Sequence, residues 1–319
     1  MSKKLLSAGK ILLFIISFIF IAFIATTYQS DIDVETLKEK WTYPESKFID
    51  VDGMSVHYRR TGKGFPIILI HGTGASLHTW EEWTKALNPF FEVISLDIPA
   101  FGLTGPHPSA DYSLESYAKF LEAFTNKLGI EQFHVAGNSL GGGIAWKYTS
   151  MYPDKVDRLI LVNASGYPLD KEDPLAFRLA KSDLWAPILL KCTPKSLFKT
   201  SLNDVFYNDD LITDKLINRY YELYLREGNR QAFIDRVRNM VYTDPKAIKT
   251  IENRTLILWG KYDEWIPVAM AHQFYKDLPN ARLTIYDNAG HVPMEEIPQE
   301  TVQDVIAFLE EIDLDVMLE

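Results

Sequence analysis

The chain has 319 residues, 47% of them hydrophobic and 24% charged, which permits a large core and excludes wholesale disorder and a membrane protein with many spans. Its formal net charge of −10 disfavours contact with phosphate backbones, so nucleic acid is not expected as a partner. The single cysteine, Cys192, excludes an intramolecular disulfide and a cysteine-based metal cluster.

Residues 1–29 are predicted to form a membrane anchor. An uninterrupted apolar run, Ile11–Ala25, follows three lysines and extends with less apolar residues to Tyr28, so residues 11–28 would span about 27 Å as a helix. A cleaved signal peptide is the alternative, but the run lacks an Ala-x-Ala cleavage sequence. Lysines before the span and acids after it predict a single-pass cell-membrane protein with a cytoplasmic N-terminus and an extracytoplasmic body. Signal cleavage would instead release that body as a secreted protein.

From Phe48 onward, short apolar patterns alternate with helical ones. Strands are predicted at Phe48–Val51, Ser55–Arg60, Pro66–Ile70, Phe91–Leu96, Phe133–Ala136, Leu159–Val162, Thr255–Trp259 and Arg282–Tyr286. The first two flank Asp52-Gly53, a dipeptide that favours a tight hairpin turn. The later runs are apolar throughout, which is typical of strands buried on both faces. The alternation therefore predicts an α/β fold, with a mostly parallel eight-stranded sheet covered by helices on both faces.

Residues 166–251 interrupt this alternation with helical patterns and no convincing strand. About 85 residues are too many for a connecting loop, so we predict a helical cap inserted over the carboxyl edge of the sheet. Open α/β sheets bind their ligands at that edge. The core is then formed by residues 47–165 and 252–319, and residues 30–46 are a polar, partly helical tether to the anchor.

Three helices can be placed from their apolar spacing. The stretch Ser113–Leu128 has its apolar residues on one helical face. In the predicted cap, one helix is capped by Thr213 and ends near Gly228. The apolar face of the next helix comprises Phe233, Val237, Met240 and Val241.

A Gly-x-Ser-x-Gly sequence, Gly137–Gly141, follows one predicted strand and opens a predicted helix, Leu140–Met151. The pentapeptide alone is a weak signal, but between a strand and a helix it is typical of a nucleophile elbow, a tight turn that exposes a serine above the sheet. The helix N-terminus beside Ser139 favours developing negative charge. Ser139 is therefore the candidate nucleophile. The pair Gly142–Gly143 indicates either tight packing against the sheet or space for a substrate.

A serine nucleophile needs a base, and the base needs an orienting acid. His291 lies just after the last predicted strand, where the chain order serine, acid, histidine places the base. Asp263 follows the strand before it and is the predicted acid. Glu264 is its rival, and Asp287 is the weaker candidate because it comes after the last strand.

The remaining histidines are given structural roles. His57 and His134 fall in predicted strands, whereas His78, His107 and His272 are expected at the surface or at helix ends.

Two backbone N–H groups are predicted to form an oxyanion hole. One belongs to Leu140, the residue after the nucleophile, and the other to Thr73 in the loop that follows Pro66–Ile70. Glycines on both sides of Thr73 let this loop turn toward the reacting centre. Each such donor typically lowers the barrier by about 2.7–4 kcal/mol. His71 is expected to brace the loop rather than to act as a second base.

Together these motifs resemble the α/β-hydrolase superfamily. They are His71–Ser76, Asp97–Gly102, Gly137–Gly142, Asp263 and Asn288–His291, and the resemblance extends from about Phe48 to Leu309. The chain is similar to serine esterases, monoacylglycerol-lipase-like enzymes and meta-cleavage carbon–carbon hydrolases. Haloalkane dehalogenases and epoxide hydrolases also carry a cap, but their nucleophile is an aspartate, so Ser139 argues against both. The family uses the Asp97 loop structurally, and no chemistry is assigned to Asp97.

The resemblance implies acyl transfer through an acyl-Ser139 intermediate, with no cofactor and no metal ion. The first hypothesis is a membrane-anchored serine hydrolase whose substrate is a small-molecule ester or a lipid, with a lipid-like or short-to-medium acyl chain. The second is a hydrolase that cleaves carbon–carbon bonds in vinylogous diketones with the same triad. The third, a catalytically idle binding protein, is disfavoured because all three triad residues are kept. Cap aromatics such as Phe177, Trp185 and Phe206 either line an apolar acyl pocket or pack against the core.

Overall fold

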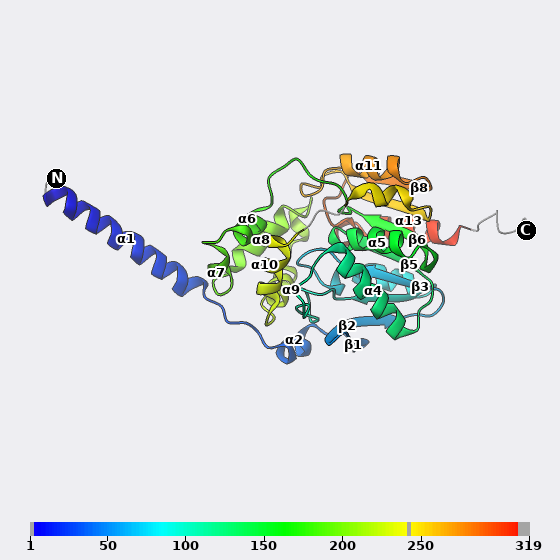
Figure 1. Ribbon diagram of the computed structural model, residues 1–319, viewed down its shortest axis with the longest axis horizontal. Coiled ribbons are helices and arrows are strands. Elements are labelled where there is room, and N and C mark those ends of the chain that lie inside the picture. The colour runs from blue at the N-terminus through cyan, green and yellow to red at the C-terminus, as the bar shows by residue number, and fades with distance from the viewer. Residues whose placement is uncertain (1–2, 241–243, 312–319) are drawn as a thin grey trace, which may run out of the picture.

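The computed structural model describes residues 3–240 and 244–311, and one eight-stranded sheet lies at its centre (Figure 1). The strands are β1 (Ser46–Val51), β2 (Met54–Thr61), β3 (Pro66–Ile70), β4 (Glu92–Leu96), β5 (Phe133–Asn138), β6 (Val156–Val162), β7 (Arg254–Gly260) and β8 (Ala281–Tyr286). Their order across the sheet is β1-β2-β4-β3-β5-β6-β7-β8. Strand β2 is antiparallel to both of its neighbours, and all other neighbouring strands are parallel. The mostly parallel eight-stranded sheet predicted from the sequence is confirmed.

Helices cover both faces of this sheet. The α-helices are α1 (Lys3–Thr27), α2 (Val34–Trp41), α3 (Glu81–Leu87), α4 (Leu114–Leu128), α5 (Leu140–Met151), α6 (Leu175–Lys181), α7 (Ala186–Leu189), α8 (Lys195–Asn203), α9 (Asp214–Tyr224), α10 (Asn229–Arg238), α11 (Ala269–Asp277), α12 (Pro293–Glu296) and α13 (Pro298–Glu310). Short 3-10 helices are η1 (Leu77–Trp80), η2 (Pro153–Lys155), η3 (Asp209–Leu211) and η4 (Pro245–Thr250). Side chains of α3 and α13 pack on one face, and those of α4, α5 and α11 pack on the other.

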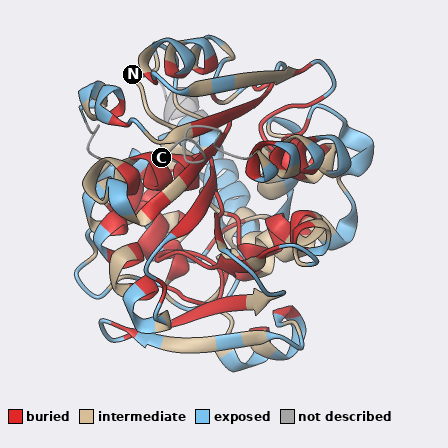
Figure 2. Ribbon diagram, turned by 90° about the vertical axis from the view of Figure 1, so that its right-hand side faces the viewer, coloured by how far each residue is buried: buried red, intermediate tan, exposed pale blue. Residues whose placement is uncertain are grey.

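The central strands are buried on both faces. In β3, Ile67 and Leu69 pack with α3 and α13, whereas Ile68 and Ile70 pack with α4 and α5, and all four are 0% exposed. Each such side chain contributes roughly 1.5–3 kcal/mol when fully buried. Figure 2 shows the buried strands between helices whose outer surfaces are exposed. This double burial explains the continuous apolar runs in the sequence.

Close packing accounts for the glycines at the start of α5. A Cβ atom on Gly141 would collide with the carbonyl group of Ile70, and one on Gly142 would collide with the side chain of Ala164. A Cβ on Gly143 would meet the Ser165 hydroxyl. Because interiors are close-packed, these neighbours have little room to move aside. Tight packing of helix against sheet, rather than space for a substrate, therefore explains Gly142 and Gly143.

Residues 166–251, here called the helical insertion, carry α6 to α10 between β6 and β7. In Figure 1 these helices lie together at the end of the molecule nearest to α1. As predicted, Thr213 caps α9 with its side chain. However, α9 ends at Tyr224 rather than near Gly228, and Gly228, with a φ of +87°, instead precedes the first turn of α10.

Some sequence-based predictions extend beyond the end of the observed helix or beyond the described residues. Met240 was expected on the second helix of the insertion, but α10 already ends at Arg238. Val241 of the same predicted face lies outside the described residues, as do residues 1–2 of the predicted anchor and 312–319 of the predicted core.

Helix α1 projects away from the body of the protein (Figure 1). Its segment Gly9–Thr27 has a mean hydropathy of 2.4, and none of it is buried in the protein. Among the described residues, this is the one helix long and apolar enough to cross a membrane.

The segment predicted as a tether, residues 30–46, is packed against the body. Helix α2 buries Leu37 and Trp41, which are 2% and 6% exposed. The Arg230 Nη2 atom on α10 donates to Asp31 Oδ1 at 2.6 Å and to the carbonyl oxygen of Gln29 at 2.9 Å. The chain that leaves α1 is therefore held against the helical insertion.

His78 links this N-terminal segment to the core. It lies near the start of η1, in line with the expected position at a helix end, but it is buried and not at the surface. Its Nε2 atom donates to the carbonyl oxygen of Trp41 at 2.9 Å, and its Nδ1 atom accepts from the Ser76 hydroxyl at 2.9 Å. Burial, together with the nearby charge of Arg219, lowers the pKa of His78 to about 3. The folded protein therefore holds this imidazole in its neutral form.

We expect His78 to make the folded protein less stable as the pH falls below about 6.5, the ordinary histidine pKa. Because the pKa is lower in the folded state, protonation favours the unfolded state, with a slope of up to about 1.4 kcal/mol per pH unit for this residue. Urea unfolding between about pH 7 and pH 5 measures that slope. His78→Gln should reduce it, and replacing the exposed His272 with glutamine should not. Equal slopes for wild type and His78→Gln would contradict the expectation.

Candidate active site

Ser139 lies in the sharp turn between β5 and α5. Its φ of +54° and ψ of −116° are strained for any residue with a side chain. Three backbone hydrogen bonds hold the turn: the Ser139 N–H donates to Val162 at 3.1 Å, and its carbonyl oxygen accepts from Ser165 at 2.9 Å and Gly143 at 3.0 Å. The turn predicted around the Gly-x-Ser-x-Gly sequence is therefore present.

Asp263 and His291 meet through a direct hydrogen bond. The His291 Nδ1 atom lies 2.7 Å from Asp263 Oδ2, and the two residues are only 4% and 6% exposed. Asp263 Oδ1 accepts from the backbone N–H groups of Trp265 at 2.7 Å and Ile266 at 2.8 Å. Since the carboxylate accepts, a neutral His291 carries its proton on Nδ1, which leaves Nε2 free to accept one.

The rival acids lie elsewhere. Glu264 is exposed, and Asp287, whose side chain is 80% exposed, pairs with Lys261 at 2.7 Å. Among the residues that the structure describes, Asp263 is the carboxylate bonded to His291.

Ser139 and His291 line the same cavity. Within residues 3–240 and 244–311, no hydrogen bond joins the Ser139 hydroxyl to the imidazole. Free enzymes often hold a nucleophile and its base apart at a distance that shortens when substrate binds. The three predicted residues thus share one site. In it, Asp263 and His291 are hydrogen-bonded to each other, whereas Ser139 and His291 are not.

The two predicted oxyanion donors also flank Ser139. Thr73 and Leu140 line the cavity, and neither of their backbone N–H groups donates to an acceptor in the described part of the chain. A Cβ atom on Gly72 would lie only 3.1 Å from the Ser139 Cβ, so the glycine permits the close approach of this loop. Both N–H groups are therefore available to a ligand.

His71 braces the loop, as expected. Its Nδ1 atom donates to the carbonyl oxygen of Gly72 at 2.7 Å, and its Nε2 atom accepts from the Ile98 N–H at 3.1 Å. Burial lowers the pKa of His71, which keeps the ring neutral. Asp97 is equally occupied, because its carboxylate accepts from His57 Nδ1 and from the Leu77 N–H, each at 2.8 Å.

Two asparagines that the sequence analysis missed hold Asp263 and His291 in place. Asn163, with a φ of +44°, donates from Nδ2 to Asp263 Oδ2 at 2.7 Å and accepts from the Gly260 N–H at 3.1 Å. Asn138 donates from Nδ2 to the carbonyl oxygen of His291 at 3.0 Å. Each lies at the carboxyl end of a buried strand, and a polar residue in that position is the sequence signal that could have identified them.

Glu296, also missed, joins the histidine loop to the helical insertion. Its Oε1 atom accepts from the Gly290 N–H and its Oε2 atom from the Tyr207 N–H, both at 2.7 Å. Burial raises the pKa of Glu296, although these backbone donors act in the opposite direction. The His291 N–H donates directly to the carbonyl oxygen of Val205 at 2.8 Å. The position of His291 is therefore coupled to residues 205–207 of the insertion.

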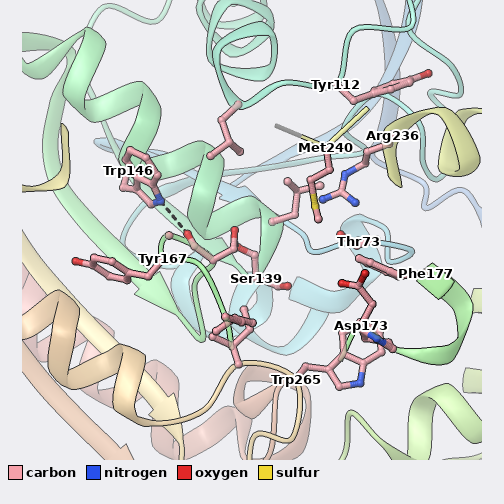
Figure 3. Close-up of a pocket in the computed structure, with 17 residues that line it drawn as sticks. Thr73, Tyr112, Ser139, Trp146, Tyr167, Asp173, Phe177, Arg236, Met240 and Trp265 are labelled. Atoms are coloured by element: carbon pink, nitrogen blue, oxygen red, sulfur yellow. Dashed lines mark hydrogen bonds between the residues drawn. The ribbon is translucent and has the colours of Figure 1, made fainter. Parts of the chain in front are cut away.

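The cavity has two lobes that share Thr73, Ser139, Phe177 and Trp265. The first lobe, about 180 Å³, is drawn in Figure 3 and is lined further by Tyr112, Leu114, Trp146, Tyr167, Asp173 and Arg236. The second lobe, about 100 Å³, borders His291 and is lined mainly by apolar side chains of the insertion, including Leu189, Leu197, Phe198, Leu202, Tyr224 and Phe233. We call the first the polar lobe, because its wall carries the charged side chains of Asp173 and Arg236 among apolar ones, and the second the apolar lobe.

Two of the three cap aromatics named in the sequence analysis take the expected roles, and the third, Trp185, takes neither. Phe177 lines both lobes, whereas Phe206 packs into the core with α3 and α13. Trp185 is 42% exposed. In the described part of the chain, no group of three or more His, Cys, Asp or Glu side chains is arranged to hold a metal ion. Independence from a cofactor stays a prediction.

Comparison with known proteins agrees with this architecture. A family model described as the alpha/beta hydrolase fold matches residues 66–298. An uncharacterized protein of Mycobacterium tuberculosis is 30% identical over 282 residues, which cover 84% of this chain and 82% of that protein. The structure of a meta-cleavage product hydrolase from Pseudomonas fluorescens is 27% identical, with a TM-score of 0.73, and the match covers 82% of this chain and 97% of that one. A membrane phospholipase A, described as a bacterial virulence factor, is 26% identical with a TM-score of 0.71, and its match covers 97% of this chain and 98% of the phospholipase.

Proposed function

Because the chain belongs to the α/β-hydrolase fold family, we propose that it is a membrane-anchored serine hydrolase that cleaves carboxylic esters through an acyl-Ser139 intermediate. The observation that most supports this proposal is the bonded pair of Asp263 and His291, which borders a cavity whose wall also holds the strained Ser139. Two backbone N–H groups, those of Thr73 and Leu140, have no acceptor among the described residues and flank the serine.

Acylation uses these groups in sequence. His291 Nε2 takes the Ser139 proton as Oγ attacks the ester carbonyl carbon, and Asp263 stabilises the imidazolium that forms. The N–H groups of Thr73 and Leu140 donate to the developing oxyanion. The bond between the carbonyl carbon and the alcohol oxygen then breaks, and His291 returns its proton to the departing alcohol.

Deacylation repeats the same steps with water. His291 takes a proton from a water molecule, the hydroxide attacks the acyl carbon, and the bond to Ser139 Oγ breaks. The proton returns to Ser139, and the products are a carboxylic acid and the regenerated serine.

Two observations favour a lipid-like ester. The apolar lobe beside His291 offers hydrocarbon contacts from Leu197, Phe198 and Phe233. A match that covers 97% of this chain leaves out too few residues to omit the whole apolar helix segment Gly9–Thr27, so the likeness to the membrane phospholipase A extends beyond the hydrolase core. We propose that this helix crosses the membrane with the N-terminus in the cytoplasm, which keeps the catalytic body near membrane-derived esters.

A second candidate function is hydrolysis of carbon–carbon bonds in vinylogous diketones. The likeness to a meta-cleavage product hydrolase supports it, and the same Ser139, Asp263 and His291 would serve that reaction. That match covers 82% of this chain, a smaller share than the 97% that the phospholipase match covers.

The experiment that separates these functions uses full-length protein in detergent micelles. p-Nitrophenyl esters from acetate to palmitate, monoacylglycerols and a 2-hydroxy-6-oxo-hexadienoate are offered in parallel. We expect turnover of esters and little or no cleavage of the diketone. Cleavage of the diketone alone would establish the second function in place of the first, and turnover of neither class would contradict both.

A further inference from the structure

Arg236 is a buried cation in the wall of the polar lobe. It lies on α10, is 6% exposed, and lines the same lobe as Ser139. Figure 3 shows its guanidinium directed from the helix into the cavity, on the side where Ser139 and Thr73 are drawn. The Nε and Nη1 atoms of Arg236 have no hydrogen-bond partner among the described residues.

The other buried arginines differ from Arg236 in having a carboxylate partner. Arg59 pairs with Glu81 at 2.5 Å, Arg158 with Asp157 at 3.5 Å, and Arg230 with Asp31 at 2.6 Å. Of the four buried arginines in the described part of the chain, Arg236 is the one without a carboxylate partner. Removing a charge from water without pairing it is strongly unfavourable. The fold therefore carries a cost that an anion in the lobe would offset.

The polar neighbours of Arg236 do not neutralise it. The Tyr117 hydroxyl lies beside the guanidinium, but it is uncharged and donates its own proton to the carbonyl oxygen of Pro99 at 3.0 Å. Asp173 also lines the lobe, but it pairs with Lys181 at 2.5 Å. Those two charges cancel, so one unbalanced positive charge remains in the lobe that Ser139 also lines.

We propose that Arg236 binds an oxyanion group of the substrate, a carboxylate or a phosphate, while the ester of the same molecule lies at Ser139. This assignment depends on the proposed ester hydrolase function and narrows its substrate class. Guanidinium donates several N–H groups, accepts none and stays charged, which suits these anions. The substrate is then amphiphilic, with a hydrocarbon part in the apolar lobe and an anionic part in the polar lobe.

Matched substrate pairs test the proposal with full-length protein. One pair is a short-chain monoacylglycerol and its 3-phosphate, and the other is a p-nitrophenyl alkanoate and the p-nitrophenyl monoester of a dicarboxylic acid. Arg236→Gln should lower kcat/KM for an anionic member at least about 10-fold, mainly through KM. The neutral member should change less than about threefold. A response of the phosphate pair alone, or of the dicarboxylate pair alone, identifies which anion the site takes.

Three further variants make the result interpretable. Arg236→Lys keeps the charge and should restore part of the preference for the anion. Arg238→Gln removes a half-exposed arginine of the same helix, paired with Asp183, and should leave both members of each pair unchanged. Calorimetric titration of the Ser139→Ala protein with the anionic and neutral esters measures binding without turnover, and should show tighter binding of the anionic ester. Adding Arg236→Gln to the Ser139→Ala protein should abolish that difference.

The outcomes separate this inference from the proposed function. If Arg236→Gln lowers kcat/KM equally for neutral and anionic esters, or if the Ser139→Ala protein binds both alike, the anion site is wrong even though esters are cleaved. If no ester is cleaved but the anion still binds through Arg236, the site is right and the proposed function is wrong.

Discussion

Ser139→Ala is expected to lower kcat for ester hydrolysis by about 10⁶-fold, the loss typical of removing the nucleophile from a serine hydrolase triad. Without Oγ, no acyl-enzyme can form, and His291 would have to activate water directly. The substitution should leave the protein folded, because Ser139 Oγ forms no hydrogen bond with the described residues. Alanine meets the same strain as serine at a φ of +54°.

Ester turnover and covalent labelling measure this effect together. A fluorophosphonate probe should add its mass to the peptide that contains Ser139 in wild type and not in the variant. Ser150→Ala, near the opposite end of α5, is the matched control and should keep both turnover and labelling. Retained turnover in Ser139→Ala, or labelling at another serine, would show that the nucleophile lies elsewhere.

The parts of the fold that the sequence predicted well are those whose burial leaves a continuous or periodic pattern. Strand β3 has the predicted bounds Pro66–Ile70, and α5 has the predicted bounds Leu140–Met151. Both are almost entirely buried, so nearly every residue in them is constrained to be apolar or small. The start of β6 is harder to predict because Asp157 and Arg158 interrupt the apolar run, and the strand begins at Val156, three residues before the predicted Leu159.

Contacts between distant segments could not be predicted, because the local sequence of one segment does not indicate which other segment it will contact. The polar composition of residues 30–46 indicated a tether, yet Asp31 is bound by Arg230, which lies 199 residues away. A glycine after an amphipathic stretch favours a helix end, but Gly228 precedes α10 instead, with its positive φ permitting the tight connection from α9.

In the candidate site, too, residues with a sequence motif could be predicted and residues without one could not. Ser139 follows from a local motif, and the chain order of motifs leads to Asp263 and His291, which the structure joins. Asn163, Glu296 and Arg236 belong to no motif. Each matters through one contact or cavity that only the folded chain creates, such as the bond of Asn163 to Asp263 at 2.7 Å.

Asp263→Asn is expected to lower kcat for ester hydrolysis by about 10⁴-fold, because it fixes His291 in the wrong tautomer. The N–H groups of Trp265 and Ile266 point at Oδ1, so the amide oxygen of the new asparagine must take that place. Its NH₂ group then takes the place of Oδ2 and donates to His291 Nδ1. The imidazole proton moves to Nε2, which can no longer accept a proton from Ser139.

Rotating the amide would not rescue the variant. The NH₂ group would then face the two backbone donors, and an unsatisfied buried donor costs about 1–3 kcal/mol. The unrotated amide also meets a donor, because Asn163 Nδ2 lies 2.7 Å from the Oδ2 position, so a modest loss of stability should accompany the loss of turnover.

Asp287→Asn, at an exposed carboxylate paired with Lys261, is the control and should preserve kcat. Ester turnover at saturating substrate, measured beside urea unfolding, tests both expectations, and a kcat for Asp263→Asn within tenfold of wild type would remove Asp263 from the mechanism.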